Sequence, residues 1–209
     1  MTLHTVKSRA RALLLVPAVA LLAPAALSAQ ASTSDPRYGL KPGLDDAGTA
    51  ILNLEHVVNR PKPREFFNPN NPADRGQTNS DFAFRGNYVF QGTYGGYQIW
   101  DVANVRDPKL VRAYVCPGGQ GDVSVYGNLL FMSVEATSGR IDCGTEGVQQ
   151  PVSPERFRGV RIFDISNLDQ PRQVAAVQTC RGSHTHTLVT DPNDRNNVYV
   201  YVQGAAGVR

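Results

Sequence analysis

The chain has 209 residues, of which 41% are hydrophobic and 19% are charged. Its formal net charge is only +3, and part of that charge lies in an N-terminal segment that we expect to be removed. So small an excess gives no electrostatic footprint for nucleic acid, which we therefore exclude as a partner.

The first 31 residues have the pattern of a secretory signal peptide. Basic residues come first, an apolar run over 12–27 follows, and small residues lead to Ala29-Gln30-Ala31, which predicts cleavage before Ser32. A membrane anchor is the alternative, but two prolines interrupt the run and no basic stop-transfer flank follows it. We expect export to the periplasm, the cell surface or the medium, with no membrane span after cleavage.

The next part of the chain alternates between irregular segments and one short strand. Residues 32–49 are polar, contain Gly and Pro, and predict a flexible N-terminal arm, whereas residues 50–58 have strand character. Residues 61–78 are rich in Pro and Asn and predict a loop.

An internal repeat predicts the fold. DFAFRGNYVFQGT, from Asp81, aligns with DVSVYGNLLFMSV, from Asp122, at an offset of 41 residues. GYQIWDVANVRDP, from Gly96, aligns with GVRIFDISNLDQP, from Gly159, at an offset of 63, so the second copy has an insertion, residues 135–158. Each copy has four short runs of β-branched and aromatic residues separated by turn signals. Four antiparallel strands at a period near forty residues are typical of a β-propeller blade.

A third copy is predicted to start at His186, because six residues separate Cys180 from His186 and six separate Cys116 from Asp122. The expected organisation is all-β: a partial propeller over 50–209, with blades at 81–116 and 122–180 and the start of a third at 186–209. This amounts to about two and a half blades.

The motifs GVRIFDISNLDQP and GYQIWDVANVRDP resemble the core motif of the LVIVD-repeat family, a bacterial group of exported β-propeller proteins. The resemblance covers roughly Ile51 to the end of the chain and implies a closed ring of four-stranded blades. It implies little chemistry, since many members of the family have no assigned activity. Residues 50–58 resemble the outermost strand of the other blades, so we expect this chain to be an N-terminal fragment whose latch strand pairs with strands beyond Arg209.

In a propeller the innermost strand of each blade starts at the mouth of the central channel. The alignment puts Asn79 and Asp81, then Gln120 and Asp122, then His184 and His186 at these positions. We predict that the first four bind a ligand.

His184 and His186 are alternate residues of an extended strand, so their imidazoles could share a divalent metal ion. A structural ring of polar side chains around a water-filled channel is the alternative. Asp101 and Asp164 occupy the same turn in different blades, and we expect them to bind turn amides rather than to form a catalytic pair.

Three cysteines in an oxidising compartment permit one disulfide. Counting strand directions puts the insertion 135–158 on the channel-mouth face, where we expect it to form a lid. The predicted pair is Cys143 with Cys180, and Cys116 is the alternative partner of Cys143.

The sequence favours an exported binding module for an unknown ligand or an extracytoplasmic protein, more than an enzyme. The alternatives are a metal-dependent oxidase or hydrolase with a His-x-His site, and a structural scaffold of the cell envelope. The identity of a ligand, and the presence of a metal, stay open.

Overall fold

The computed structural model describes residues 33–43, 46–68, 70 and 78–204 of the chain. The chain divides into two units, Met1–Ala50 and Ile51–Arg209, which we describe separately. The predicted signal peptide, residues 1–31, lies outside the described residues. In the first unit, residues 33–43 and 46–50 form turns and extended chain with no helix or strand.

The second unit opens with irregular chain. Residues 51–57 are exposed, Val58 is half-buried, and none of them belongs to a strand, so the structure does not contain the predicted latch strand. Within the predicted loop at 61–78, the described residues include one short 3-10 helix, η1 (Arg64–Phe66), whose Phe66 is buried. Residues 69 and 71–77 lie outside the described part of the chain.

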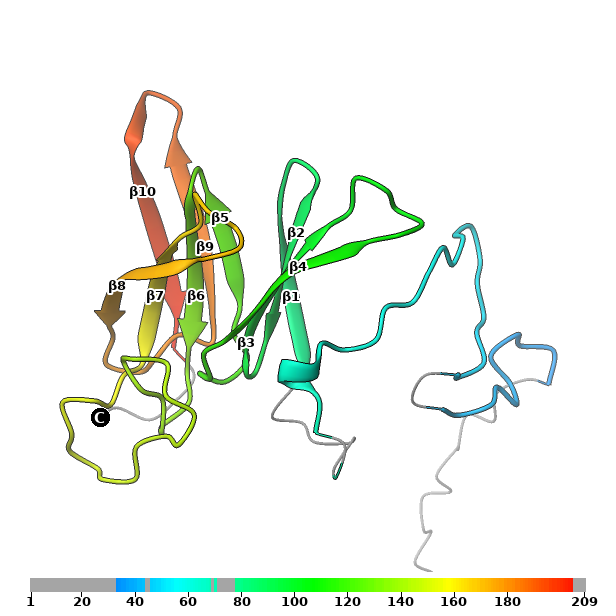
Figure 1. Ribbon diagram of the computed structural model, residues 1–209, viewed down its shortest axis with the longest axis horizontal. Coiled ribbons are helices and arrows are strands. Elements are labelled where there is room, and N and C mark those ends of the chain that lie inside the picture. The colour runs from blue at the N-terminus through cyan, green and yellow to red at the C-terminus, as the bar shows by residue number, and fades with distance from the viewer. Residues whose placement is uncertain (1–32, 44–45, 69, 71–77, 205–209) are drawn as a thin grey trace, which may run out of the picture. The chain divides into compact units, whose positions relative to one another are not determined.

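The prediction of antiparallel sheets of four strands is confirmed (Figure 1). The first sheet has the strand order β1-β2-β3-β4, with β1 (Asn79–Arg85), β2 (Tyr88–Thr93), β3 (Gly96–Asp101) and β4 (Lys109–Val115). The second has the order β5-β6-β7-β8, with β5 (Val123–Tyr126), β6 (Leu129–Val134), β7 (Gly159–Asp164) and β8 (Arg172–Gln178). A hairpin of β9 (Thr185–Asp191) and β10 (Asp194–Gln203) follows.

Equivalent turns join the strands in both sheets. Gly86 and Gly127 each have φ 57°, which lets two-residue turns join the first two strands of each sheet. Asp101 Oδ1 accepts a hydrogen bond from the Ala103 amide, and Asp164 Oδ1 accepts one from the Ser166 amide, both at 2.9 Å. The predicted role of these two carboxylates in binding turn amides is confirmed.

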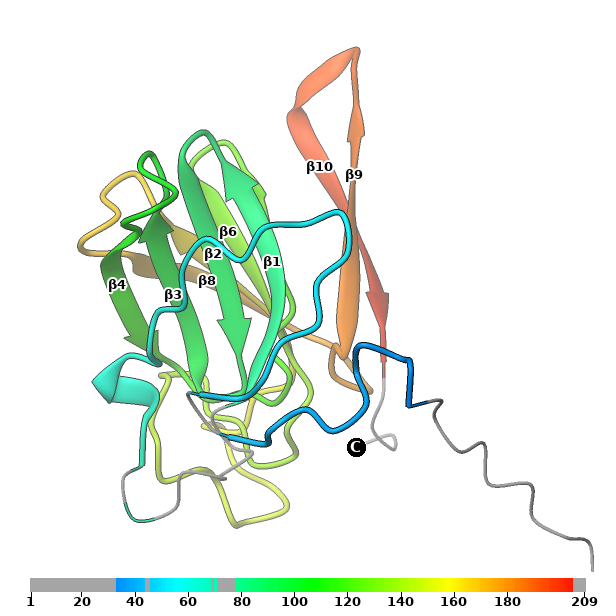
Figure 2. The same cartoon turned by 90° about the vertical axis from the view of Figure 1, so that its right-hand side faces the viewer.

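The first two sheets pack face to face, as Figure 2 shows with the first sheet in front of the second. The cluster between them combines residues of the first sheet, among them Phe90, Tyr97 and Ile99, with Leu130, Met132 and Phe163 of the second. The Tyr97 and Phe163 rings meet edge to face with centroids 5.2 Å apart. Aromatic contacts between the two sheets therefore help to hold them together.

Backbone hydrogen bonds correct the alignment of the third copy. The Cys116 amide donates to Gly95 O and the Thr179 amide donates to Arg158 O, so Thr179 is the equivalent of Cys116. β8 ends at Gln178, one residue earlier than the spacing of the cysteines suggests. The predicted equivalence of His186 with Asp122 is therefore wrong by one residue, and His186 corresponds to Val123.

The starts of β1, β5 and β9 lie at one end of the second unit (Figure 1). We call this the connector end, because residues 117–122 and 179–184 cross there from one sheet to the next. The insertion 135–158 also begins there, since the amides of Glu135 and Ala136 donate to Gly118 O at 2.8 and 2.9 Å. Among the described residues, no helix is long and apolar enough to span a membrane.

Candidate functional site

Two of the predicted mouth residues connect consecutive sheets. Asp81 Oδ1 accepts a hydrogen bond from the Val123 amide at 3.2 Å, and Asp122 Oδ2 accepts one from the His186 amide at 2.7 Å. Asp122 Oδ2 also lies 3.0 Å from His186 Nδ1. Each aspartate therefore binds the first strand of the following sheet through the equivalent amide.

The two carboxyl groups interact, and their pKa values shift in opposite directions. Burial raises the pKa of Asp81 to about 6, and its hydrogen bond to Asp122 and the Asp122 charge add to this effect. Burial also acts to raise the pKa of Asp122, but its hydrogen bonds with His186 and Asp81 outweigh burial, so the net shift is downward. Asp122 is thus the ionised member of the pair, and Asp81 is the member that takes up a proton in mild acid.

This pair makes stability depend on pH. Because the folded pKa of Asp81 exceeds the unfolded value of 3.8, the folded chain binds more protons than the unfolded chain between pH 4 and 6, and stability falls as pH rises through this window. Asp81→Asn keeps a donor for Asp122 and carries no charge. We expect the free energy of unfolding of this variant at pH 7.5 to exceed that of the wild type by about 1 kcal/mol, after allowance for solvent screening.

Urea unfolding at pH 4.5, 6.0 and 7.5 measures this effect. The control is Asp169→Asn, which removes an exposed carboxyl group in the β7–β8 connection and should leave the pH profile unchanged. An Asp81→Asn variant that is less stable than the wild type at pH 7.5, or that keeps the decline in stability between pH 4.5 and 6.0, would contradict the raised pKa of Asp81.

Ser133, His186 and Asp122 together resemble the residue types of a hydrolytic triad. Ser133 Oγ lies 2.8 Å from His186 Nδ1 and 2.7 Å from Ser183 Oγ. A triad requires the serine on one imidazole nitrogen and the carboxylate on the other, whereas here both share Nδ1. His186 Nε2 is buried and has no hydrogen-bond partner among the described residues. The geometry is that of a structural network rather than a proton relay.

His184 belongs to a second cluster, which contains a residue that the sequence analysis missed. Glu135 Oε2 lies 2.5 Å from His184 Nδ1, and Glu135 Oε1 accepts a hydrogen bond from the Gln120 amide at 3.1 Å. Glu135 therefore links the two connectors. Its position at the end of β6, as the first residue of the insertion, was the available signal in the sequence.

The structure brings only some of the remaining predicted site residues into contact with one another. Gln120 is joined to His184 through Glu135, and its buried Oε1 has no partner among the described residues. Asn79 Oδ1 instead accepts a hydrogen bond from Gln98 Nε2 at 3.1 Å within the first sheet. His184 and His186 contact different carboxylates, and no group of three or more metal-ligating side chains occurs in the described part of the chain.

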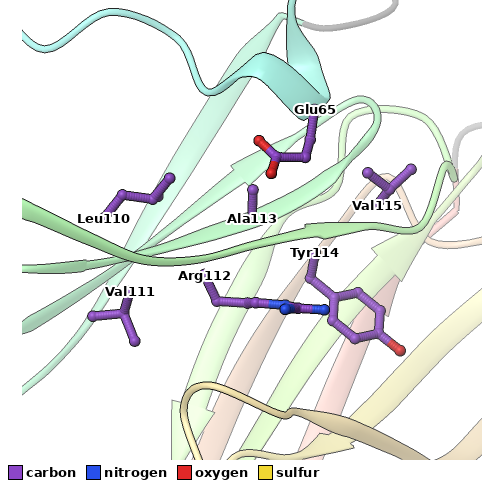
Figure 3. Close-up of a pocket in the computed structure, with 7 residues that line it drawn as sticks. All are labelled: Glu65, Leu110, Val111, Arg112, Ala113, Tyr114 and Val115. Atoms are coloured by element: carbon purple, nitrogen blue, oxygen red, sulfur yellow. The ribbon is translucent and has the colours of Figure 1, made fainter.

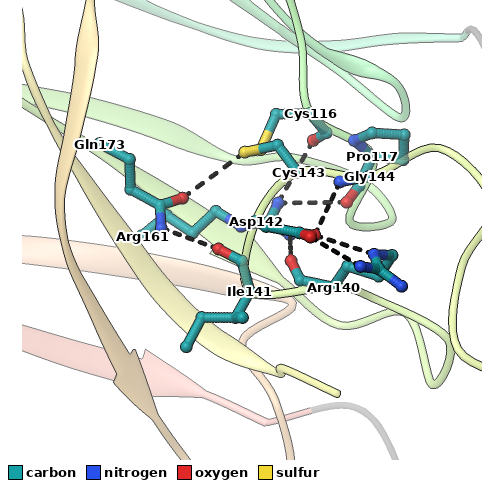
Figure 4. The surroundings of a disulfide bond; sticks show 9 residues. All are labelled: Cys116, Pro117, Arg140, Ile141, Asp142, Cys143, Gly144, Arg161 and Gln173. Atoms are coloured by element: carbon teal, nitrogen blue, oxygen red, sulfur yellow. Dashed lines mark hydrogen bonds and ion pairs between the residues drawn. A yellow bond between two sulfur atoms is a disulfide. The ribbon is translucent and has the colours of Figure 1, made fainter. Parts of the chain in front are cut away.

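The insertion is attached by a disulfide between Cys116 and Cys143 (Figure 4). Cys143 was predicted to pair with Cys180, with Cys116 as the alternative, and the structure contains the alternative. Cys180 is a free and exposed thiol. The reason is that Thr179 occupies the position equivalent to Cys116, and Cys180 lies one residue beyond it.

Arg161, which was not predicted as important, supports the same region from within. Its side chain is fully buried and donates hydrogen bonds to Cys116 O at 3.3 Å, to Pro117 O at 3.1 Å and to Arg140 O (Figure 4). Burial lowers the pKa of Arg161 to about 10, so the guanidinium is charged at neutral pH. The equivalent residue in the first sheet is the uncharged Gln98, so the repeat does not predict a buried charge at this position.

A pocket of about 250 Å³, open to solvent on one side, lies at the connector end. Tyr94 from the β2–β3 turn, the connector 117–119 and the insertion supply its walls. The lining residues from the insertion are Ala136, Ser138, Gly139, Gly144, Thr145 and Gly147.

A second hollow, of about 520 Å³, lies along the edge strand β4 beside η1. Figure 3 shows Glu65 on one side of the strand, with Tyr114 pointing to the other side. None of the predicted site residues lines this hollow. The connector end is therefore the candidate site.

No known family model matches the chain, and no curated protein matches it.

Proposed function

We propose that the sheets of the second unit are consecutive blades of a β-propeller of the LVIVD-repeat type. Support comes from equivalent positions. Phe90 and Phe131 are 0% and 3% exposed beneath the following sheet, whereas their equivalent Tyr201, on the last described hairpin, is 65% exposed. Val123 and His186 are 2% and 8% exposed against the preceding sheet, whereas their equivalent Phe82, on the first sheet, is 52% exposed. Each outer face is thus built to pack against a further sheet of the same repeat.

The proposed activity of this propeller is to bind a ligand or partner at the connector end. One observation carries the proposal: Glu135 joins both connectors beside a preformed pocket, and a disulfide fixes the insertion across it. Binding sites prefer such concave surfaces built from loops on a rigid scaffold. We also propose that the chain is exported, which the N-terminal pattern and the Cys116–Cys143 disulfide both support.

A metal-dependent enzyme is the weaker proposal, because the two histidines are held by separate carboxylates. Affinity selection separates the two functions. The purified chain is incubated with the low-molecular-weight fraction of the medium from producing cells, and the retained compounds are identified by mass spectrometry. We expect a compound that is retained and recovered unchanged.

Glu135→Gln should abolish retention, and His184→Gln serves as a second variant if Glu135→Gln fails to fold. Arg106→Gln, an exposed arginine at the opposite end of the first sheet, should retain the compound like the wild type. Chemical conversion of the compound would favour an enzyme. Retention of nothing, or equal retention by all variants, would reject the connector end as a binding site.

A further inference from the structure

The pocket at the connector end has a chemical character of its own. We infer that it binds an uncharged, hydroxyl-rich ligand about the size of one pyranose ring. This inference rests on the proposed function and specifies the class of ligand. The pocket volume of about 250 Å³ is below the range of roughly 300–1,000 Å³ for drug-sized ligands, so it suits a single small ring.

The absence of charged side chains from the lining disfavours ionic ligands. None of the ten lining residues is Lys, Arg, His, Asp or Glu. The nearby guanidinium of Arg140 is already paired with Glu146 at 3.1 Å and with Glu155 at 2.9 Å. The carboxylate of Glu135, which lies next to Gly119, is likewise in contact with His184. An ion that lost its water in this pocket would therefore gain no unpaired counter-charge, which is unfavourable.

The lining nevertheless contains three hydroxyl groups. The hydroxyl groups of Tyr94, Ser138 and Thr145 take part in no hydrogen bond within the described residues. Each hydroxyl can both donate and accept, as a sugar hydroxyl can. The Tyr94 ring adds an apolar face of the kind that the C–H face of a sugar ring can cover.

The walls are preformed, which lowers the entropic cost of binding. A Cβ atom at Gly119 would lie 2.4 Å from Glu135 Cγ, and one at Gly139 would lie 2.7 Å from Phe157 O. Only glycine fits these close approaches, so backbone surface lines the pocket. The Cys116–Cys143 disulfide fixes the insertion that carries most of the lining.

The test compares three probes with one ring. Methyl β-D-glucopyranoside is neutral, glucuronate is an anion and glucosamine is a cation. Titration of the purified chain, followed by saturation-transfer NMR, should show saturable binding of the neutral probe with a Kd of about 1–10 mM, and binding at least tenfold weaker for both charged probes. Binding of a charged probe as tight as that of the neutral one would overturn the inference, as would no binding of the neutral probe.

Variants locate the site. Thr145→Val and Tyr94→Phe each remove one hydroxyl and should weaken binding about fivefold or more, whereas Thr137→Val, an exposed threonine of the same loop outside the lining, should bind like the wild type. Equal binding by all variants would place the sugar elsewhere and overturn the inference. The two proposals can fail separately. A charged compound retained in a Glu135-dependent manner would reject the ligand class inferred here but would leave the proposed binding function standing.

Discussion

Arg161→Met is expected to lower the free energy of unfolding by about 3 kcal/mol. The substitution keeps an unbranched apolar stem but removes the donors for three backbone carbonyls, those of Cys116, Pro117 and Arg140. Cys116 is fully buried, so its carbonyl cannot turn to water when the guanidinium is gone. The contact of the guanidinium with the Phe157 ring, at 5.5 Å from the centroid, is lost as well.

Arg161→Lys separates the effect of charge from that of hydrogen bonding. A lysine keeps the positive charge but cannot reach three carbonyls from one planar group, so we expect an intermediate loss of about 1–2 kcal/mol. Arg112→Leu, an exposed arginine on β4, is the control and should change stability by less than about 0.5 kcal/mol. Chemical unfolding of the three variants measures these differences. If Arg161→Met were as stable as Arg112→Leu, the buried guanidinium would not be supporting the connector end.

The strands could be predicted from the sequence because their signals are local. Alternating apolar residues, the Gly86 and Gly127 turns, and the Asp101 and Asp164 caps each act within a few residues, and each recurs in the second copy. Because two copies of the repeat align in register, the strand assignment in one copy supports that in the other, and a single hairpin offers no such comparison.

The alignment of the third copy failed for a physical reason. A cysteine was used as a landmark, although the position that matters is set by the last backbone hydrogen bond of the outer strand. That bond is made by Thr179. A shift of one residue moves a strand side chain to the opposite face, so His186 faces the second sheet and bonds to Ser133 there.

The site was only partly predictable for a related reason. Asp81 and Asp122 were found because they recur in the repeat. Glu135 and Arg161 have no acidic or basic counterpart in the first sheet, where Tyr94 and Gln98 stand at the equivalent places. Their roles depend on the insertion, which occurs in one copy only, so no periodic pattern could reveal them.

Cys143→Ser is expected to lower the free energy of unfolding by about 3.5 kcal/mol, because the Cys116–Cys143 bond closes a loop with a sequence separation of 27. Within the insertion the described residues form one isolated bridge, between Arg140 and Arg156, and no helix or strand, so the cross-link limits the conformations of a largely irregular loop. Chemical unfolding under non-reducing conditions measures the loss. Faster hydrogen–deuterium exchange over 136–147 should accompany it, because these residues would no longer be fixed beside the pocket.

Two further variants distinguish the cross-link from other effects. Cys180→Ser removes the free thiol and should leave stability within about 0.5 kcal/mol of the wild type; a loss equal to that of Cys143→Ser would instead indicate the pairing of Cys143 with Cys180. Cys143 has φ 64°, a left-handed conformation that costs a non-glycine residue about 1 kcal/mol. Cys143→Gly should therefore be more stable than Cys143→Ser by about that amount. Equal stability of these two variants would mean that residue 143 leaves the left-handed region once the cross-link is gone, and that the disulfide itself holds the insertion in its observed path.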